Sequence, residues 1–345
     1  MSSSPTVSII VPVYNVAGYV GRCFDSIAAQ TYPYLECIFV DDCGTDASME
    51  IVRERIEAYQ GSIDFKIVRH EKNRGLSAAR NTGTDSATGE YIWYVDSDDF
   101  IGNDAVADIF RSIGKNRPNI ISFNYAHFTN GDDFSARLIR VPHYECISEL
   151  LRAVCVYNRE YWGAQFRIYR KNFLLLEELR FSEGLIHEDV DFLIRVLRTK
   201  TRLLWTNACC AYFFRGGRSG GITSSGVSKK RVLSWWMIAQ NAYSYAQACD
   251  EDFQIYIEVF CKMLLSILSV GVMQEIELRE LLREIHLQRK KFALLLKKGQ
   301  GLQPKILSYL LPYSVCIACF ALKVWGFLLR ENARFRRIFG ISLSR

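Results

Sequence analysis

The sequence predicts an α/β fold, in which a mostly parallel sheet with helices on both faces precedes a helical C-terminal region. Over the first 125 residues, β-rich runs alternate with helical stretches, and most of the strands are continuously apolar. Strands of this kind, joined by helical crossovers, are typical of a parallel sheet that is covered on both faces. After the polar loop RGGRSGGITSSG (215–226), strand character stops and the apolar periodicity becomes helical.

The expected elements follow one another in a regular order. The strands are VSIIVPVYN (7–15), LECIFVDD (35–42), FKIVRHE (65–71), YIWYVD (91–96) and NIISFNY (119–125). Helices are expected at about 19–30, 46–59 and 76–87. Residues 145–215 combine amphipathic helices with a strand-like run at 203–214, and further helices are expected at 235–247, 255–273 and 276–285. We therefore expect a main domain at 1–226, a helical region at 227–300 and a tail at 301–345.

The positive charge of the chain is concentrated near its C-terminus. The formal net charge is +6, yet residues 289–345 hold twelve Lys or Arg and a single acid, Glu331. The preceding 288 residues therefore carry a net charge of about −5. This asymmetry argues against a general nucleic-acid-binding surface and indicates a local interaction of the tail with an anionic partner.

The cysteines and the first residues both indicate the cytoplasm. Many of the eleven cysteines stand inside apolar runs, as Cys37, Cys155 and Cys261 do, which is typical of small buried hydrophobes and not of a disulfide framework. The segment MSSSPTVSII has neither a basic n-region nor an apolar stretch of signal-peptide length. We therefore expect the main domain to lie in the cytoplasm.

Polar side chains gather at the ends of three expected strands, where ligands bind in parallel sheets. Asp96-Ser97-Asp98-Asp99 follows the fourth strand. Several acids at one strand end need compensation, and a hard divalent cation supplies it with one or two carboxylates plus substrate phosphates. The alternative is that one aspartate caps the helix expected near Asn103 and the others are solvated turn residues.

Two further strand ends carry candidate nucleotide contacts. Asp41 and Asp42 follow a buried strand, and a carboxylate there can accept hydrogen bonds from a nucleobase imide or a ribose hydroxyl. Their alternative role is a turn or an N-cap at Thr45-Asp46. Tyr14, at the end of the first strand, offers a ring face for stacking on a base, although simple packing is the commoner role of such an aromatic.

The region 184–218 holds an acid pair and two arginines. On local grounds, Glu188-Asp189 reads as a pair of first-turn acids favoured by the helix dipole. Arg215 and Arg218, in a Gly/Ser-rich loop, could close over a diphosphate or be solvated. The chain contains no GxGxxG and no GxxxxGK[ST], which disfavours dinucleotide oxidoreductases and P-loop NTPases.

Four ordered motifs nevertheless carry a specific resemblance. The segments VSIIVPVYNVAGYVGRCFDSIAAQTY, VDDCGTDAS, NRGLSAARNTG and GEYIWYVDSDDF closely resemble the inverting family 2 glycosyltransferases of the GT-A fold, and HEDVDF with the Arg/Ser loop extends the likeness to about residue 225. Within the family, the chain looks most like enzymes that build bacterial capsule, exopolysaccharide or O-antigen units. One departure is that the family usually reads VDDGSTD, whereas Cys43 and Gly44 stand here, so the turn after Asp42 is expected to be rearranged.

The resemblance implies roles for individual residues. Asp189 would be the catalytic base, which reverses the local interpretation of the acid pair. Asp98 would bind Mg²⁺ or Mn²⁺ that bridges the donor diphosphate, and Asp96 would lie by the ribose. Tyr14 and Asp42 would hold the nucleotide base. The whole set of implied donor-nucleotide contacts is Pro12, Tyr14, Asp41, Asp42, Arg80, Asp96, Arg215 and Arg218.

The expected function is therefore a metal-dependent inverting glycosyltransferase. It would use a nucleotide-sugar donor, with UDP-sugar the best single expectation, and a saccharide or lipid-linked saccharide acceptor in surface polysaccharide biosynthesis. The alternative is a catalytically silent nucleotide-sugar-binding subunit of a glycosyltransferase complex. The run 306–322 has no charge and is flanked by basic residues, which suits a helix lying on the inner face of the cell membrane. Its alternatives are a helix packed on the main domain and a true transmembrane span.

Overall fold

The computed structural model describes most of the chain up to residue 298. The described residues are 4–128, 137–139, 145–155, 163–214, 228–248, 252–270, 276–298, 305, 308 and 311. The chain forms two compact units, Met1–Ser224 and Ser225–Arg345, and each is described here by itself. The domain boundary that the sequence suggests, at residue 226, lies close to this division.

The first unit contains a parallel sheet made from its first four strands. These are β1 (Val7–Val13), β2 (Leu35–Asp41), β3 (Asp64–Arg69) and β4 (Tyr91–Tyr94), in the spatial order β3-β2-β1-β4. β1 pairs in parallel with β2 and with β4, and β2 pairs in parallel with β3. Their carboxyl ends therefore meet at one edge, as the apolar runs of the sequence predict.

Beyond β4 the sheet becomes mixed. Its further strands are β5 (Phe100–Ile101), β6 (Ile120–Phe128), β7 (Arg137–Ile139), β8 (Arg167–Arg170) and β9 (Leu203–Phe214). β8 lies between β4 and β6 and is antiparallel to both, whereas β9 is parallel to β6. β8 was not expected from the sequence, because a strand of four residues is too short to show a periodic pattern.

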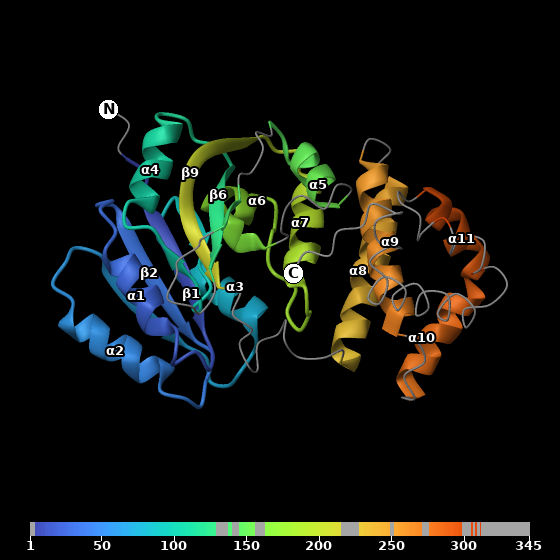
Figure 1. Ribbon diagram of the computed structural model, residues 1–345, viewed down its shortest axis with the longest axis horizontal. Helices are drawn as coiled ribbons and strands as arrows, with labels where there is room; N and C mark the ends of the chain where they lie inside the picture. Colours follow the sequence, from blue (N-terminus) through green and yellow to red (C-terminus); the bar gives the residue numbers. More distant parts are fainter. Residues whose placement is uncertain are drawn as a thin grey trace. The chain divides into compact units, whose positions relative to one another are not determined.

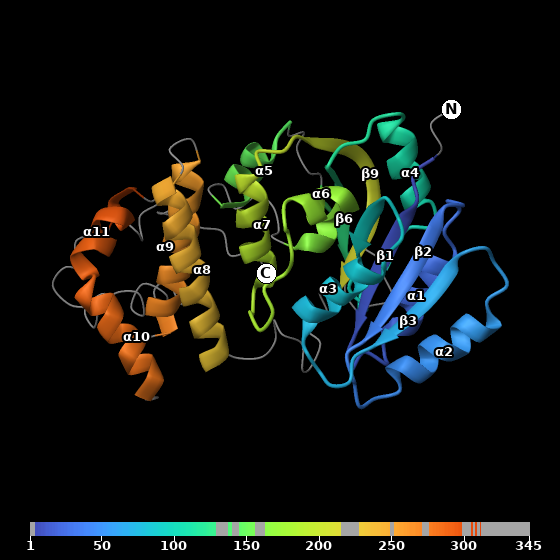
Figure 2. The same cartoon turned by 180° about the vertical axis from the view of Figure 1, so that it is seen from behind.

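Helices cover both faces of the parallel strands (Figures 1 and 2). Alternate side chains of a strand point to opposite faces. Ile9 and Val11 belong to the core that also contains side chains of α1 (Val20–Ala28), α2 (Ser48–Ala58) and α4 (Ala105–Ile113). Ile10 faces the other way, toward α3 (Leu76–Ser86), and there a Cβ added to Gly83 would lie 2.3 Å from the Cγ2 of Ile10. Glycine is therefore required for α3 to approach the sheet this closely.

Aromatic contacts fix a second helix on the face that α3 covers. The ring of Phe181 stacks on Phe192 of α7 (Glu188–Arg198) at 4.3 Å and meets Tyr94 of β4 edge-on at 5.1 Å. Tyr169 of β8 meets Phe192 edge-on at 5.5 Å. The elements between β7 and α7 also include α5 (Ile147–Cys155), the 3₁₀ turn η1 (Ala164–Phe166) and α6 (Lys171–Leu176). Phe166 of η1 belongs to the opposite core, where its ring stacks on Tyr125 at 4.4 Å. The packing brings the first turn of α7 toward the end of β4.

The second unit is helical, as the sequence predicts. The helices among its described residues are α8 (Lys229–Ala248), α9 (Phe253–Val270), α10 (Ile276–Leu287) and α11 (Arg289–Lys298). Phe292 of α11 contacts the rings of Trp236 and Phe260, with centroids 5.9 and 5.4 Å away, so α8, α9 and α11 share a core. Within the described part of the chain, none of the helices combines the length and the apolar character needed to cross a bilayer. The expected tail at 301–345 lies outside the described residues except for three single positions.

Candidate active site

The turn that follows β4, residues 96–99, carries the sharpest acidic motif and is called the acidic turn below. The backbone N–H of Asp99 donates to the carbonyl of Asp96 at 3.0 Å, which closes the turn. Helix α1 supports it from outside, since the guanidinium of Arg22 donates to the carbonyl of Asp98 at 3.5 Å and the thiol of Cys23 to that of Asp96 at 3.8 Å. Burial lowers the pKa of Arg22, and the carboxylates of Asp99 and Asp98 oppose that shift. The turn is therefore anchored through its backbone beside a partly buried cation.

Arg80 of α3 is the centre of a buried ion cluster. Its guanidinium donates to Asp96 Oδ1 at 2.8 Å and to Glu188 Oε1 at 2.7 Å, and its side chain is 2% exposed. It also stands over the ring of Phe181, 5.1 Å from the centroid. Burial lowers the pKa of Arg80, but the two carboxylates outweigh burial and raise it above its ordinary value. Arg80 thus remains a cation and ties the acidic turn to the first turn of α7; we call Arg80, Asp96 and Glu188 the Arg80 cluster.

Asp189 stands next to this cluster in the first turn of α7. Its side chain is partly buried, and its Oδ1 accepts the N–H of Val190 at 2.9 Å. Burial raises the pKa of Asp189 above its ordinary value, while the charge of Arg80 acts in the opposite direction. The preceding His187 adopts a left-handed backbone conformation with φ of 66° and is the N-cap residue of the helix. A carboxylate with a raised pKa beside the ends of the strands has the properties of a general base.

Asp42 accepts three hydrogen bonds from described residues. Its Oδ1 accepts hydrogen bonds from the ring Nδ1 of His70 and from the backbone N–H of Arg74, both at 2.7 Å. Its Oδ2 receives the backbone N–H of Gly75 at 2.8 Å. Gly75 has a φ of +88°, a conformation that glycine adopts without steric cost, and this bend aims two successive N–H groups at one carboxylate. The backbone N–H of Asp42 donates to Val13 at the end of β1.

Asp41 holds the turn between β2 and α2. Its Oδ1 accepts the N–H of Cys43 at 3.0 Å, and its Oδ2 lies 3.4 Å from Arg69 and 3.9 Å from Arg53. Cys43 has a φ of 58°, so it keeps the left-handed conformation that favours glycine although its side chain is larger. The family usually has a glycine at this position, and in this chain the turn accommodates a cysteine instead.

The other expected donor contacts occupy the same edge or lie outside the described residues. Pro12 is buried within β1 opposite Val40, and the ring of Tyr14, just after the strand, is 44% exposed. The structure thus brings Tyr14 and Asp42 to the end of β1. Arg215 and Arg218 lie outside the described residues.

The acidic turn fits a divalent cation that takes most of its ligands from a substrate. Among the residues that the structure describes, no three His, Cys, Asp or Glu side chains gather as a metal site. Mg²⁺ characteristically uses one or two protein carboxylates and completes its shell with phosphate and water oxygens. Asp98 on the anchored turn can provide such a carboxylate, and the neighbouring Asp96 pairs with Arg80.

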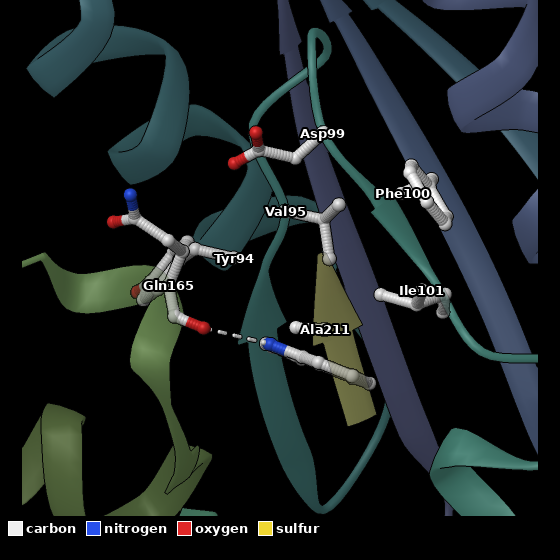
Figure 3. A pocket seen from close by; sticks show the side chains of 8 residues that line it. Tyr94, Val95, Asp99, Phe100, Ile101, Gln165 and Ala211 are labelled. Atoms are coloured by element: carbon white, nitrogen blue, oxygen red, sulfur yellow. Dashed lines mark hydrogen bonds between the residues drawn. The ribbon is translucent and has the colours of Figure 1, made fainter. Parts of the chain in front are cut away.

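A narrow recess beside the acidic turn belongs to the packing of the sheet. Figure 3 labels seven of the residues that line it, Tyr94, Val95, Asp99, Phe100, Ile101, Gln165 and Ala211, and the eighth is Trp93. It has no room for a water molecule, and the indole N–H of Trp93 donates to the carbonyl of Gln165 at 3.1 Å. The side chains that line the recess pack against the acidic turn, and the space between them is too small for a ligand.

The sequence does not indicate the contacts that three residues of the site make. Arg22 has no motif that marks it, and His70 is a lone histidine at the end of β3. Glu188 is part of the HED motif, but its contact with Arg80 joins residues 108 positions apart. The only sequence signal for Glu188 was its place beside Asp189.

Comparison with known proteins identifies a matching family and several relatives of the chain. The family described as "Glycosyl transferase family 2" matches residues 8–175. An uncharacterized glycosyltransferase of Haemophilus influenzae is 38% identical over 214 residues, which are 60% of this chain and 78% of the relative. Glycosyltransferase GlyA of Streptococcus pneumoniae is 34% identical over 227 residues, which are 61% of this chain. The chain spans about a third of the length of GlyA, since the match covers 31% of it.

Solved structures give the same fold. TarS 1–349 of S. aureus, in complex with UDP-GlcNAc, superposes with a TM-score of 0.66 at 22% sequence identity. The match covers 94% of this chain and 92% of that chain. At this identity the likeness concerns the fold, and it confirms the predicted α/β class with a helical C-terminal region.

Proposed function

Because the chain belongs to glycosyl transferase family 2, we propose that it moves a sugar from a nucleotide-sugar donor to an acceptor hydroxyl, with inversion at the sugar carbon. The observation that carries this proposal is the Arg80 cluster. One buried cation joins the acidic turn, where a donor diphosphate would sit, to the first turn of α7, where a candidate base stands. Donor activation and acceptor deprotonation are thereby assigned to neighbouring parts of one site.

Asp189 is the proposed general base. Its carboxylate takes the proton of the acceptor hydroxyl while that oxygen attacks C1 of the donor sugar, and the bond between C1 and the diphosphate oxygen breaks. The attack comes from the face opposite the diphosphate, so the configuration at C1 inverts. Because burial raises the pKa of Asp189, its carboxylate is a stronger base than that of an exposed aspartate.

The donor nucleotide is proposed to lie along the ends of β1, β2 and β4. Asp42 accepts a hydrogen bond from the base, Tyr14 offers its ring, and Asp96 lies by the ribose. The terminal nitrogens of Arg80 donate to Glu188 and Asp96, so its proposed part is to hold Asp96 in place. The remaining proposed contacts are Pro12, Asp41, Arg215 and Arg218. The UDP-GlcNAc bound by TarS supports a UDP-sugar as the donor.

A divalent cation, Mg²⁺ or Mn²⁺, is proposed at Asp98. When bound, it supplies positive charge to the departing diphosphate. The contribution of the chain is a carboxylate on a turn whose backbone is held by Arg22 and Cys23. Phosphate and water oxygens would supply the remaining ligands, so one carboxylate would be a sufficient protein ligand.

The proposed acceptor is a saccharide or lipid-linked saccharide in bacterial surface polysaccharide synthesis, in keeping with the bacterial glycosyltransferases that resemble the chain. We propose that residues 1–226 form the catalytic domain and 227–300 a helical region. The basic tail at 301–345 is proposed to attach the cytoplasmic enzyme to the inner face of the cell membrane, where a lipid-linked acceptor would be presented. The second candidate is a catalytically silent nucleotide-sugar-binding subunit, and the presence of all the expected carboxylates, Asp96, Asp98 and Asp189, favours the enzyme over it.

The test is release of nucleoside diphosphate by the full chain, with Mg²⁺ or Mn²⁺, a panel of nucleotide sugars and a membrane extract as the source of acceptor. We expect release with one donor that requires the metal and is lost on adding EDTA. Product analysis by NMR should show the inverted anomer. Tight nucleotide binding without turnover on any donor would favour the silent subunit.

A further inference from the structure

The carboxylate of Asp42 has little hydrogen-bonding capacity left for a ligand. A carboxylate oxygen has two lone pairs, so the group offers about four acceptor positions. Among the described residues, His70 and Arg74 take both positions on Oδ1, and Gly75 takes one on Oδ2. One acceptor position therefore remains, and it belongs to Oδ2. Of the three donors, only the one from His70 is a side chain and can be changed by substitution.

His70 is held rigidly in the position that fills Oδ1. The residue is buried, with 6% exposure, and its ring Nε2 lies 2.9 Å from the hydroxyl of Thr82 on α3. Its backbone N–H donates to the carbonyl of Asp41 at 3.0 Å, and its carbonyl accepts the thiol of Cys43 at 2.9 Å. When the Thr82 hydroxyl donates to Nε2, the neutral ring carries its proton on Nδ1 and can donate it to Asp42.

We propose that His70 determines the base specificity of the donor site, by occupying Oδ1 so that Asp42 can accept one hydrogen bond and not two. This inference rests on the proposed function, in which Asp42 receives the nucleotide base. It assigns the donor to the class of nucleotides whose base presents a single imide N–H.

The hydrogen-bonding edges of the bases give this restriction its chemical meaning. Uracil and thymine present one imide N–H, which matches the remaining position on Oδ2. Guanine presents N1–H and an exocyclic amine side by side, and this pair needs one free lone pair on each carboxylate oxygen. Cytosine has an acceptor where uracil has its imide N–H, so a carboxylate repels it. Asp42 therefore accepts the base of uridine or thymidine nucleotides. With guanine, one N–H group of the base would stay without an acceptor, and burying an unpaired N–H weakens binding.

The test measures binding of UDP, dTDP, GDP and CDP to the full chain by calorimetry, at one fixed Mg²⁺ concentration. For the wild type we expect UDP or dTDP to bind at least about tenfold more tightly than GDP and CDP, the size of effect that a hydrogen bond to a charged group supplies. In His70→Ala, a lone pair on Oδ1 becomes available, so the ratio of GDP to UDP affinity should rise by about tenfold. His70→Asn is the matched control: its amide nitrogen can take the place of Nδ1, so the wild-type ratio should persist.

Several outcomes separate the inference from its premise. If GDP binds the wild type as tightly as UDP, or if His70→Ala leaves the ratio unchanged, the role of His70 is refuted while the proposed function stands. If none of the four nucleotides binds, the proposed function itself fails. The wild-type comparison of the four nucleotides needs no substitution. Thr82→Val retains His70 but removes the partner of its Nε2, and it should shift the ratio of GDP to UDP affinity in the same direction as His70→Ala. Thermal unfolding of each variant verifies that it is folded.

Discussion

The guanidinium of Arg80 lies 2.7 Å from Oε1 of Glu188 and so connects α3 with the first turn of α7, although the two residues are 108 positions apart in the chain. Both side chains are nearly inaccessible to solvent, with exposures of 2% and 9%. The same guanidinium holds Asp96 at 2.8 Å. The position of the candidate base is therefore linked to the position of the acidic turn through one residue.

Arg80→Met should strongly destabilise the fold, because it leaves two largely buried carboxylates without their cation. Breaking a buried ion pair by removing one partner costs about 3–5 kcal/mol. Arg180→Met is the control, since Arg180 pairs with Asp85 at 2.7 Å on the surface, where such pairs contribute about 0–1 kcal/mol. Urea unfolding gives the free energy of unfolding of both variants. Equal losses would show that the Arg80 cluster contributes no more than a surface pair.

Asp189→Asn should bind the donor nucleotide like the wild type but lose sugar transfer. An amide cannot take the proton from the acceptor hydroxyl, and general-base catalysis contributes about 10²- to 10⁴-fold to the rate. Calorimetry with nucleoside diphosphate and the rate of its release from the donor provide the two measurements. Transfer within a few-fold of the wild type would move the role of base to Glu188 or His187.

The pH profile of transfer should show an acid limb that belongs to Asp189. Because burial raises the pKa of Asp189, its base form is lost as the pH falls through this raised value, and the rate falls with it. Glu188→Gln removes a neighbouring negative charge, so the acid limb should move to lower pH. Glu183→Gln, at an exposed site paired with Arg74, should leave the limb unchanged. An acid limb that stays in place in Glu188→Gln would exclude this coupling.

Asp98→Asn should abolish metal-dependent transfer while the fold stays intact. The substitution removes the charge that the cation needs and hardly changes the side-chain volume. Turnover measured across a range of Mn²⁺ and Mg²⁺ concentrations, with thermal unfolding as the check on folding, tests the assignment. Near-normal turnover at low metal concentration would contradict it.

Removal of residues 301–345 should release the protein from membranes without loss of donor binding. The expected attachment combines an apolar run with basic flanks, and each basic residue contributes about 1 kcal/mol at an anionic surface. The full chain should sediment with membranes, be released only in part by high salt, and become more soluble on truncation. A full-length protein that stays wholly in the supernatant without detergent would favour a tail packed on the main domain.

Much of the fold follows from local sequence patterns. The family and the α/β class were predicted correctly, because four motifs occur in order and because β1, β2 and β4 are continuously buried runs. The later strands were harder. β8 has four residues and an arginine at each end, so its place between β4 and β6 arises from pairing across the sheet and leaves no periodic signal.

The site was predictable where its residues end strands and less so where they meet across the fold. Asp42 and Asp96 follow buried runs, so their convergence could be anticipated from the sequence. The contact of Glu188 with Arg80 depends on how α7 packs, and the one between His70 and Asp42 joins the ends of two adjacent strands. Nothing in the sequence around His70 separates it from an ordinary core histidine. The roles of Asp98 and Asp189 remain predictions.

Around Arg80 the site has more negative charge than positive, since Asp96, Glu188 and Asp189 surround one guanidinium. A nucleotide-sugar donor is itself a polyanion. We expect Coulomb repulsion between the proposed donor and this cluster to slow their encounter, salt to screen that repulsion, and a divalent cation bound to the two charges of the donor diphosphate to cancel it. The ionic composition of the medium therefore acts first on the rate of donor capture and only afterwards on the chemical step.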